Sequence, residues 1–254
     1  GAHLPDFQTI LDRFVLDKDL TCDRFAAGVV SYDTNATVQD GLVERMRQLM
    51  ERHDVPAHIC RRGSRTIEIG SGTGKLSRVL DAFAGRFGTL EMWDLASEAP
   101  VTGAHRIFRK TDAELQLMRT PSESADLIAS ASTVQWFNSP SRFMEECARI
   151  LMPGGLLLVG TYAAGNLSAV EAATGRGLPL LQPEEWQAVT PESFECLAAD
   201  TYEVEMEFDT AADVFRHLKS TGVNSLGRGV GPAAMRQAIE AFPCDLDGKY
   251  RISY

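Results

Sequence analysis

A short β-branched run passes into a glycine-rich turn at residues 65–74, Arg-Thr-Ile-Glu-Ile-Gly-Ser-Gly-Thr-Gly, and a helical pattern follows from Lys75. A strand, a glycine turn and a helix in this order are typical of nucleotide-binding α/β proteins. Gly70 and Gly72 can adopt backbone angles closed to other residues and let a ligand approach the main chain, while Gly74 lets the helix start pack against the strand. The turn therefore predicts the first β-α unit of a parallel sheet, with a ligand site beside it.

The glycine spacing indicates which nucleotide binds. A dinucleotide fingerprint is G-x-G-x-x-G, whereas here the third glycine follows two residues after the second, which disfavours a nicotinamide oxidoreductase. Glu68, on the strand, would repel a pyrophosphate but can hold an ammonium or sulfonium group. This E-x-G-x-G-x-G string resembles motif I of class I S-adenosylmethionine-dependent methyltransferases. A glycine turn that merely closes a β-α unit is the alternative.

Acidic residues end the next two expected strands. Asp94 closes the apolar run 89–94 about twenty residues after the turn, where a Rossmann-like site places the acid that accepts the ribose hydroxyls. Asp112 follows the strand 106–109, and its carboxylate beside the Ala113 backbone N–H would suit the adenine ring. Either aspartate could instead cap a turn. Ligands of an open α/β sheet gather at the carboxyl ends of its strands, so Glu68, Asp94 and Asp112 are expected in one crevice.

Composition sets the class of protein. The 254 residues are 44% hydrophobic and 24% charged, as in an ordinary soluble globular chain, and no apolar run is long enough to span a membrane. With no basic leader either, we expect a cytoplasmic protein. The net charge of -10 disfavours nucleic acid as a partner. Five scattered cysteines without a C-x-x-C pair are expected to pack as small apolar groups, and no histidine spacing predicts a metal site.

Strand and helix patterns alternate along the chain from residue 65. A helix over 38–52 is expected before the first strand, and a fourth strand over 126–130, a helix over 140–151 and a fifth strand over 156–160 after a Pro-Gly-Gly turn. This order predicts a doubly wound, mostly parallel α/β sheet. The alternating run 202–208 and residues 250–254 predict an antiparallel pair at the sheet edge, which would make seven strands, and the last of these is expected to stop early.

Several further strings together are more selective than the turn. These are Phe-Ala-Ala-Gly-Val-Val-Ser-Tyr-Asp at 25–33, Asp-Ala-Glu at 112–114, Ser-Thr-Val-Gln-Trp at 132–136, Gly-Thr-Tyr at 160–162 and Leu-Lys-Ser-Thr-Gly-Val-Asn-Ser-Leu at 218–226. With the turn they resemble the biotin-pathway malonyl-acyl-carrier-protein O-methyltransferases, over roughly residues 20–254. The resemblance implies one Rossmann-like methyltransferase domain spanning 1–254, with an N-terminal helical segment (1–60), a cofactor-binding core (65–163) and a helical cap (164–200 and 210–243).

The resemblance also implies ligands and sites. S-adenosylmethionine would give its methyl group to the free carboxylate of malonyl-acyl carrier protein, leaving S-adenosylhomocysteine, in a monomeric enzyme without metal. The expected cofactor residues are Gln39, Glu68, Gly70, Ser71, Gly72, Gly74, Asp94, Leu95, Asp112, Ala113 and Ser130, and the expected substrate residues are Tyr32, Trp136, Tyr162, Arg216 and Lys219. One departure from the family is the segment 95–104, which is too short and too rich in Pro and Gly for the usual helix and predicts a more open adenosyl pocket.

No catalytic triad is expected, because a malonyl carboxylate is ionised at neutral pH and is already the nucleophile. Tyr32 could cover the cofactor, orient the substrate, or simply pack. An acidic chain that docks an acidic carrier protein needs clustered cations, and the best candidates are Arg176, Arg216, His217, Lys219, Arg228 and Arg236. Each could equally be a solvated helix residue. There are two alternative functions. The protein could methylate another small-molecule acceptor, or it could bind the cofactor without turnover.

Overall fold

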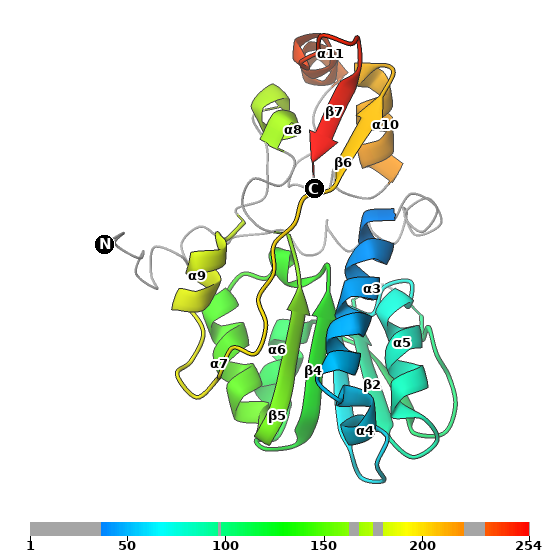
Figure 1. Ribbon diagram of the computed structural model, residues 1–254, viewed down its shortest axis with the longest axis vertical. Coiled ribbons are helices and arrows are strands. Elements are labelled where there is room, and N and C mark those ends of the chain that lie inside the picture. Colours follow the sequence, from blue (N-terminus) through cyan, green and yellow to red (C-terminus); the bar gives the residue numbers. More distant parts are fainter. Residues whose placement is uncertain (1–36, 96–97, 163–167, 175–179, 221–231, 254) are drawn as a thin grey trace. The chain divides into compact units, whose positions relative to one another are not determined.

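The computed structural model describes residues 37–95, 98–162, 168–174, 180–220 and 232–253 (Figure 1). The chain divides into two compact units. The first unit contains the described residues within 39–161 and 183–199, and the second contains those within 37–38, 162–182 and 200–253. The first unit contains the glycine turn, and the second contains the antiparallel strands.

A five-stranded parallel sheet forms the centre of the first unit. Its strands are β1 (Arg65–Ile69), β2 (Thr89–Asp94), β3 (Arg106–Lys110), β4 (Ala125–Ala131) and β5 (Leu151–Gly160), in the spatial order β3-β2-β1-β4-β5. Every neighbouring pair is parallel, so the doubly wound sheet predicted from the alternating pattern is confirmed. The strand order reverses between β1 and β4, and the carboxyl ends of the strands at such a reversal are where doubly wound sheets bind their ligands.

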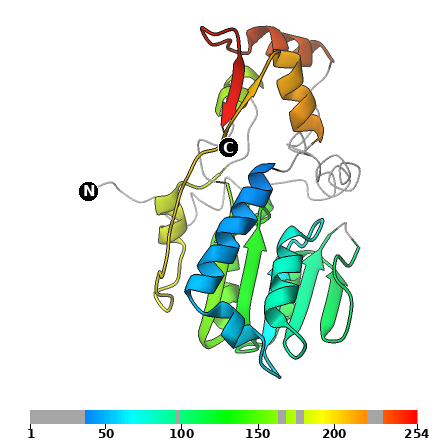
Figure 2. The ribbon, with the colours of Figure 1, turned by 45° about the vertical axis from the view of Figure 1, so that its right-hand side comes forward.

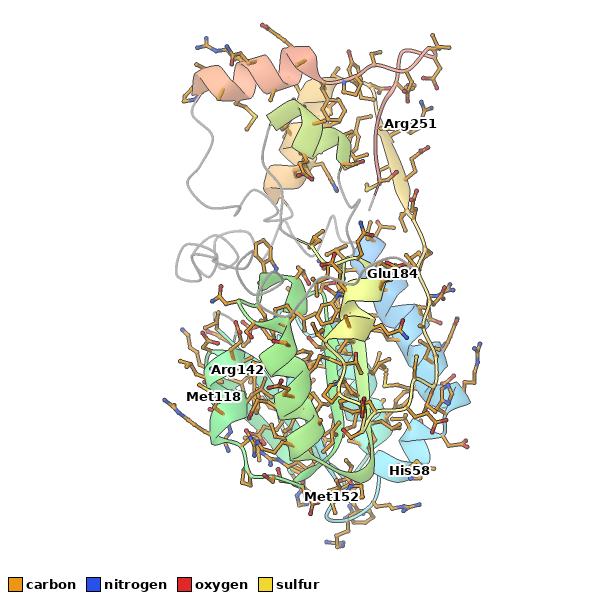
Figure 3. All side chains as sticks on the ribbon, turned by 90° about the vertical axis from the view of Figure 1, so that its left-hand side faces the viewer. His58, Met118, Arg142, Met152, Glu184 and Arg251 are labelled. Atoms are coloured by element: carbon orange, nitrogen blue, oxygen red, sulfur yellow. The ribbon has the colours of Figure 1, made fainter. Side chains whose placement is uncertain are left out.

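Helices cover both faces of this sheet (Figures 1 and 2). The helices of the first unit are α3 (Thr37–Arg52), α4 (Val55–Ile59), α5 (Lys75–Ala84), α6 (Ala113–Arg119), the 3-10 turn η1 (Val134–Trp136), α7 (Pro140–Ile150) and α9 (Pro183–Ala188). Helices α3, α4 and α5 pack on one face, and α6 and α7 lie on the other, where Arg142 of α7 reaches Met118 of α6 (Figure 3). No helix in the described ranges is long and apolar enough to cross a membrane.

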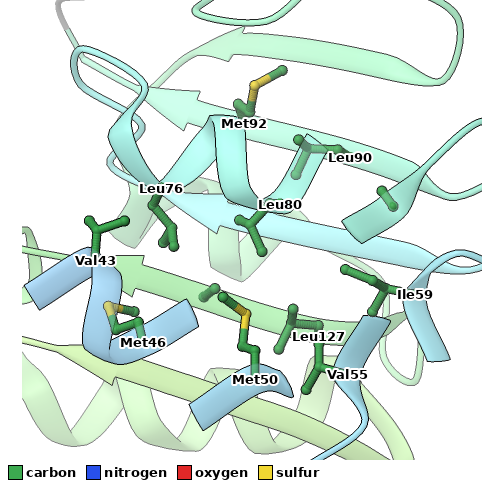
Figure 4. Packing of buried hydrophobic residues seen from close by; sticks show 12 residues of the cluster. Val43, Met46, Met50, Val55, Ile59, Leu76, Leu80, Leu90, Met92 and Leu127 are labelled. Atoms are coloured by element: carbon green, nitrogen blue, oxygen red, sulfur yellow. The ribbon is translucent and has the colours of Figure 1, made fainter. Parts of the chain in front are cut away.

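The core under α3, α4 and α5 is built from aliphatic and methionine side chains (Figure 4). Met50, Leu80, Leu90 and Leu127 come from four different elements, and each is at most 1% exposed. Side chains alternate across a strand, so Leu90 and Met92 face this core while Glu91, between them, faces the other side of the sheet. Because each buried leucine contributes about 1.5 to 3 kcal/mol, this layer fixes α5, and with it the end of the glycine turn.

Arg106 joins the edge strand β3 to the carboxyl end of α5. Its guanidinium donates to the carbonyl oxygens of Gly85 and Gly88 at 2.6 and 2.8 Å and to the Asp81 carboxylate at 2.6 Å. The last carbonyls of a helix have no partners within the helix, and a cation there is favourable. Arg106 therefore secures β3 although no described residue between β2 and β3 is helical.

A buried carboxylate holds three strands together on the opposite face. Glu91 of β2 is 1% exposed and accepts hydrogen bonds from Arg65 of β1 at 2.7 Å and from Arg109 of β3. Trp93 also donates its indole N–H to Glu91, at 3.2 Å. Burial by itself would raise the pKa of Glu91, but the hydrogen bonds from Arg109, Arg65 and Trp93 outweigh it and hold that pKa below its ordinary value.

The predicted Pro-Gly-Gly turn before the fifth strand is wrong as a boundary. Strand β5 begins at Leu151, which pairs with Ala125, and the next pair is Leu127 with Leu156. Pro153 and the two glycines form a bulge inside the strand, since proline cannot donate to the ladder. Leu151 pairs before the bulge, so the strand starts five residues earlier than the apolar run 156–160 indicates.

Cysteine packing is also only partly as predicted. Cys147 of α7 is fully buried, and burial raises the pKa of its thiol. Cys60, Cys196 and Cys244 are exposed, so they do not fill the interior, and Cys22 lies outside the described residues. These three cysteines stand in loops, where apolar periodicity gives no information on burial.

The second unit has its own small core. Its elements are α8 (Ser168–Thr174), β6 (Glu205–Phe208), α10 (Ala211–Ser220), α11 (Pro232–Ala241) and β7 (Tyr250–Ser253). The predicted antiparallel pair is present as β6 and β7, but it forms a separate two-stranded sheet, so the prediction of seven strands in one sheet is wrong. Val214, Phe215, Leu218 and Ile252 are buried together beneath it. The pair therefore covers the apolar faces of α10 and α11 instead of extending the parallel sheet.

Replacing Glu91 with Gln should lower the free energy of unfolding by about 2 to 3 kcal/mol, because Arg65 and Arg109 lose a shared carboxylate. The native pKa is depressed, so this stabilisation is present above the ordinary value of 4.5 and is lost on acidification. Urea denaturation at pH 7 and at pH 4 should show a smaller difference between variant and wild type at pH 4. Glu44→Gln, at an exposed carboxylate paired with Arg47, is the control and should change little. A Glu91→Gln variant as stable as wild type at pH 7 would contradict this account.

Candidate cofactor and acceptor site

The glycine turn is fixed by backbone hydrogen bonds to the end of β2. The N–H groups of Gly70 and Ser71 both donate to the Trp93 carbonyl oxygen, at 2.8 and 2.9 Å, and Gly74 N–H donates to Ser71 O at 2.9 Å. All three glycines have positive φ, at 74°, 50° and 90°. Residues with a Cβ adopt such angles only at a cost, so this turn requires glycine at these positions.

Each glycine meets a different surrounding. A Cβ at Gly70 would lie 2.0 Å from Thr133 Oγ1, and one at Gly74 would lie 2.4 Å from Pro100 Cβ. The space beside Gly74 is therefore occupied by the connection between β2 and β3, whereas the sequence analysis expected strand β1 to pack there. A Cβ at Gly72 would have no atom of the described residues within 4 Å. Of the three, Gly72 is the one whose open side matches a ligand lying against the main chain.

Asp94 holds the tip of this turn. Its Oδ2 accepts a hydrogen bond from Gly72 N–H at 2.8 Å, and its backbone oxygen accepts one from Thr111 N–H at 2.9 Å. The carboxylate is thus beside the glycine that faces open space, at the end of the strand, as the sequence predicted. Contact with a ribose remains a prediction.

Glu68 lies in the interior. It is 1% exposed, and Ser77 in the first turn of α5 donates its hydroxyl to Glu68 Oε1, while Oε2 has no hydrogen-bond partner among the described residues. Burial raises the pKa of Glu68 to about 8, against the opposing effect of the Ser77 hydrogen bond and with a smaller contribution from the charge of Asp94. Glu68 is therefore mostly protonated at neutral pH and ties β1 to α5. Its role toward an ammonium or sulfonium group remains a prediction.

Asp112 caps α6. Its Oδ1 accepts from Glu114 N–H at 2.9 Å, which is the capping arrangement that the sequence left open. Ala113, the first residue of the helix, is buried. The adenine-binding role of this pair remains a prediction. Glu114 itself reaches away from the cap, since its two carboxylate oxygens accept the N–H groups of Asn138 and Ser139 at 2.8 and 3.1 Å.

The segment 132–139, which we call the β4–α7 loop, is held to both neighbouring strand ends. Ser132 has φ 55° and donates its N–H to Gly160 O at 2.8 Å, while Thr133 Oγ1 lies 3.4 Å from Gly70 O. Gln135 is buried and accepts from the Thr161 hydroxyl at 2.9 Å. The loop therefore borders the carboxyl ends of β1 and β5, where the sequence placed the methyl group.

The other predicted residues are spread around these elements. Ser130 is fully buried and donates its hydroxyl to Ile69 O at 2.9 Å, so in this structure it joins β4 to β1. Gln39 is half-buried in the first turn of α3, next to Asp40, whose carboxylate pairs with Lys75 at 2.5 Å. That ion pair brings the start of α3 to the start of α5. Leu95 is exposed beyond β2, and Trp136 and Tyr162 are half-buried.

The predicted docking residues fall largely in the second unit. Arg216 is 72% exposed on α10 and pairs with Asp213. The ring of His217 lies against that of Phe208 at a tilt of 47°, and burial lowers the pKa of His217, which disfavours its positive charge and weakens the predicted cationic group. Arg236 is exposed on α11. Tyr32, Arg176 and Arg228 and the side chain of Lys219 lie outside what the structure describes.

Sequence reasoning missed the residues that hold the site in place. Ser77 donates to Glu68, and Glu114 accepts from the backbone of the β4–α7 loop. Gln135 accepts from Thr161. Glu114 and Gln135 stand inside strings that were noted, which was an available signal. Their partners are backbone groups and residues at long sequence separation, which a linear pattern does not reveal.

Comparison with known proteins agrees with this geometry. Residues 67–159 match the methyltransferase domain family. The malonyl-[acyl-carrier protein] O-methyltransferase of Bacteroides helcogenes is 30% identical over 94% of this chain and 96% of its own length, and that of Haemophilus influenzae is 32% identical over 83% and 79%. The YcgJ protein from Bacillus subtilis superposes with a TM-score of 0.54 over 83% of this chain and 93% of its own, at 18% identity, which is a likeness of fold.

A doubly wound sheet with this glycine turn, matched by the domain family, defines a protein of the class I methyltransferase type. The class is thus the one that the glycine spacing indicated. The chain belongs to the malonyl-[acyl-carrier protein] O-methyltransferase family, because the likeness to its members extends over nearly the whole chain.

Replacing Glu68 with Gln should stabilise the protein without added ligand at neutral pH. The native pKa is raised from 4.5 to about 8, so the stabilisation of the protonated form is complete below pH 4.5 and is lost as pH rises toward 8. Gln keeps an oxygen for the Ser77 hydroxyl and does not ionise. Urea denaturation of both proteins should give similar stability at pH 5 and a more stable variant at pH 8. Equal pH dependence in variant and wild type would show that Glu68 is not a neutral buried acid.

Proposed function

We propose that this protein transfers the methyl group of S-adenosylmethionine to the free carboxylate of malonyl-acyl carrier protein, as an early step toward the pimeloyl part of biotin. The observation that carries the proposal is the likeness to malonyl-[acyl-carrier protein] O-methyltransferases over 94% of the chain, across both units. The direct test is formation of methyl ester and S-adenosylhomocysteine from malonyl carrier protein. Rescue of a strain lacking the biotin methyltransferase is the test in cells.

The residues at the carboxyl ends of β1, β2 and β3 fit an adenosyl cofactor. Ser71 is 5% exposed, and its hydroxyl has no hydrogen-bond partner among the described residues, while the adjoining Gly72 has open space above it. A buried polar group without a partner is costly, so a ligand that supplied one would be favoured. The turn would hold the methionine part of the cofactor, Asp94 the ribose, and Asp112 with Ala113 the adenine.

The chemistry asks little of the protein beyond alignment. When bound, S-adenosylmethionine supplies a methyl group on a positively charged sulfur. A malonyl carboxylate oxygen would form the new bond to the methyl carbon as the carbon–sulfur bond broke, the electron pair of that carbon–sulfur bond would stay on sulfur, and no proton would have to move. The residues of the β4–α7 loop therefore have to orient an already ionised nucleophile and exclude water, and no general base is required.

The docking of an acidic carrier protein needs a local cationic surface, because the chain carries a net charge of -10. Residues 214–239 contain Arg216, Lys219, Arg228 and Arg236 and no Asp or Glu. This run covers most of α10 and α11 of the second unit, and it supports carrier docking there. We also propose that the enzyme is monomeric and cytoplasmic and uses no metal.

Each of two alternative functions can be distinguished from the proposed one by an experiment. Methylation of another small carboxylate, hydroxyl or amine is possible on the same fold, and competition between malonyl carrier protein and free acids separates this case. A binding protein without turnover would take up S-adenosylmethionine but release no S-adenosylhomocysteine.

Asp94→Ala should weaken S-adenosylhomocysteine binding roughly ten- to a hundredfold, which is about 1.5 to 3 kcal/mol, through loss of charge-assisted hydrogen bonds to the ribose. Isothermal titration calorimetry measures this directly. Asp94→Asn is the matched control for turn geometry, because its amide oxygen can still accept from Gly72 N–H. Wild-type affinity in a folded Asp94→Ala protein would remove Asp94 from the site.

Reversing two charges on α10 with Arg216→Glu and Lys219→Glu should raise KM for malonyl carrier protein several-fold, with less effect on a small malonyl thioester. Added salt should weaken wild-type turnover of the carrier-bound substrate. Arg62→Glu with Arg86→Glu is a charge-matched control, since both arginines lie against Phe87 near the amino ends of β1 and β2. Equal losses on both substrates would indicate general damage, and unchanged KM values would place docking elsewhere.

A further inference from the structure

Glu114 makes contacts that neither helix capping nor cofactor binding explains. It lies in the first turn of α6, two residues after Asp112, and its carboxylate Oε1 and Oε2 accept the N–H groups of Asn138 and Ser139 at 2.8 and 3.1 Å. These two N–H groups immediately precede α7, which Ser139 caps through its hydroxyl. The same carboxylate therefore spans 24 and 25 residues of sequence to reach the end of the β4–α7 loop.

The remainder of the β4–α7 loop is anchored at its other end. Ser132 N–H binds Gly160 O, and Gln135 binds the Thr161 hydroxyl, both at the carboxyl end of β5. Between these anchors and the Glu114 contact stands Trp136, the predicted substrate residue. Loops that carry a reacting partner need fixed geometry, since a displacement of about 1 Å can cost about a hundredfold in rate.

We propose that Glu114 is a positioning residue that fixes the acceptor-side β4–α7 loop relative to the predicted adenine-binding start of α6. This inference rests on the proposed function and deepens it. Because Asp112, Ala113 and Glu114 are consecutive, any shift of the start of α6 is passed to Asn138 and Ser139. The carboxylate suits this task because it offers two acceptor oxygens to two backbone donors, and hydrogen bonds to a charged acceptor are stronger than neutral ones.

The structural part of the proposal is tested without substrate by hydrogen exchange with mass spectrometry. Glu114→Ala should raise exchange in peptides covering 132–139 by about tenfold or more, because the N–H groups of Asn138 and Ser139 lose their acceptors, and should leave peptides of α3 and β2 unchanged. Glu114→Gln should give an intermediate value, because the amide keeps one acceptor oxygen. Glu145→Ala, at an exposed carboxylate of α7, is the control and should match wild type. Unchanged exchange at 132–139 in Glu114→Ala would overturn the proposal.

The functional part is tested by comparing binding and turnover. In Glu114→Ala, kcat/KM for malonyl carrier protein should fall about ten- to a hundredfold, with the Kd for S-adenosylhomocysteine within about twofold of wild type, and Glu114→Gln should recover part of the loss. A parallel loss of cofactor affinity, or full activity in Glu114→Ala, would overturn the positioning role. If wild type itself does not methylate malonyl carrier protein, the proposed function fails, and the exchange experiment still decides whether Glu114 fixes the loop.

Discussion

The hydrogen bond from Gly72 N–H to the Asp94 carboxylate, at 2.8 Å, is the contact on which the arrangement of the site depends. It fixes the tip of the glycine turn to the end of β2, while the Trp93 carbonyl oxygen holds the base of the same turn. Because the turn is followed at once by α5, these contacts also set where that helix begins. This side of the candidate site is therefore built from backbone groups of the glycine turn, and their positions are set by the neighbouring strand β2. Side chains such as Asp94 serve mainly to hold these backbone groups in place.

The sheet was predictable because its signals are local. Strands β2, β3 and β4 lie within one residue of the bounds that the residue pattern predicted, and β2 ends at Asp94 as expected. The antiparallel pair was also visible as an alternating run, but its attachment was not. Whether β6 joins the main sheet or pairs only with β7 depends on which apolar faces it covers, and here the side chains of α10 and α11 supply that surface.

The candidate site was predictable in its residue types and less so in their roles. The glycines and Asp94 follow from spacing, because the turn geometry and the strand end require them. Glu68 lies under α5 and accepts a hydrogen bond from Ser77, a contact that the sequence did not indicate, and its expected role toward the ligand stays a prediction. The contacts of Glu114 and Gln135 could not be predicted, as they depend on which loop comes to lie opposite each side chain.

The short connection between β2 and β3 has a consequence for how this chain can vary. Pro100 occupies the space that a side chain at position 74 would need, so the two positions form one steric unit although 26 residues separate them. Position 74 therefore requires glycine for two separate reasons, because its φ of 90° strains any residue with a Cβ and because Pro100 fills the space beside it. In related sequences a change in the length of this connection should therefore alter the residue at position 100 and leave the third glycine in place.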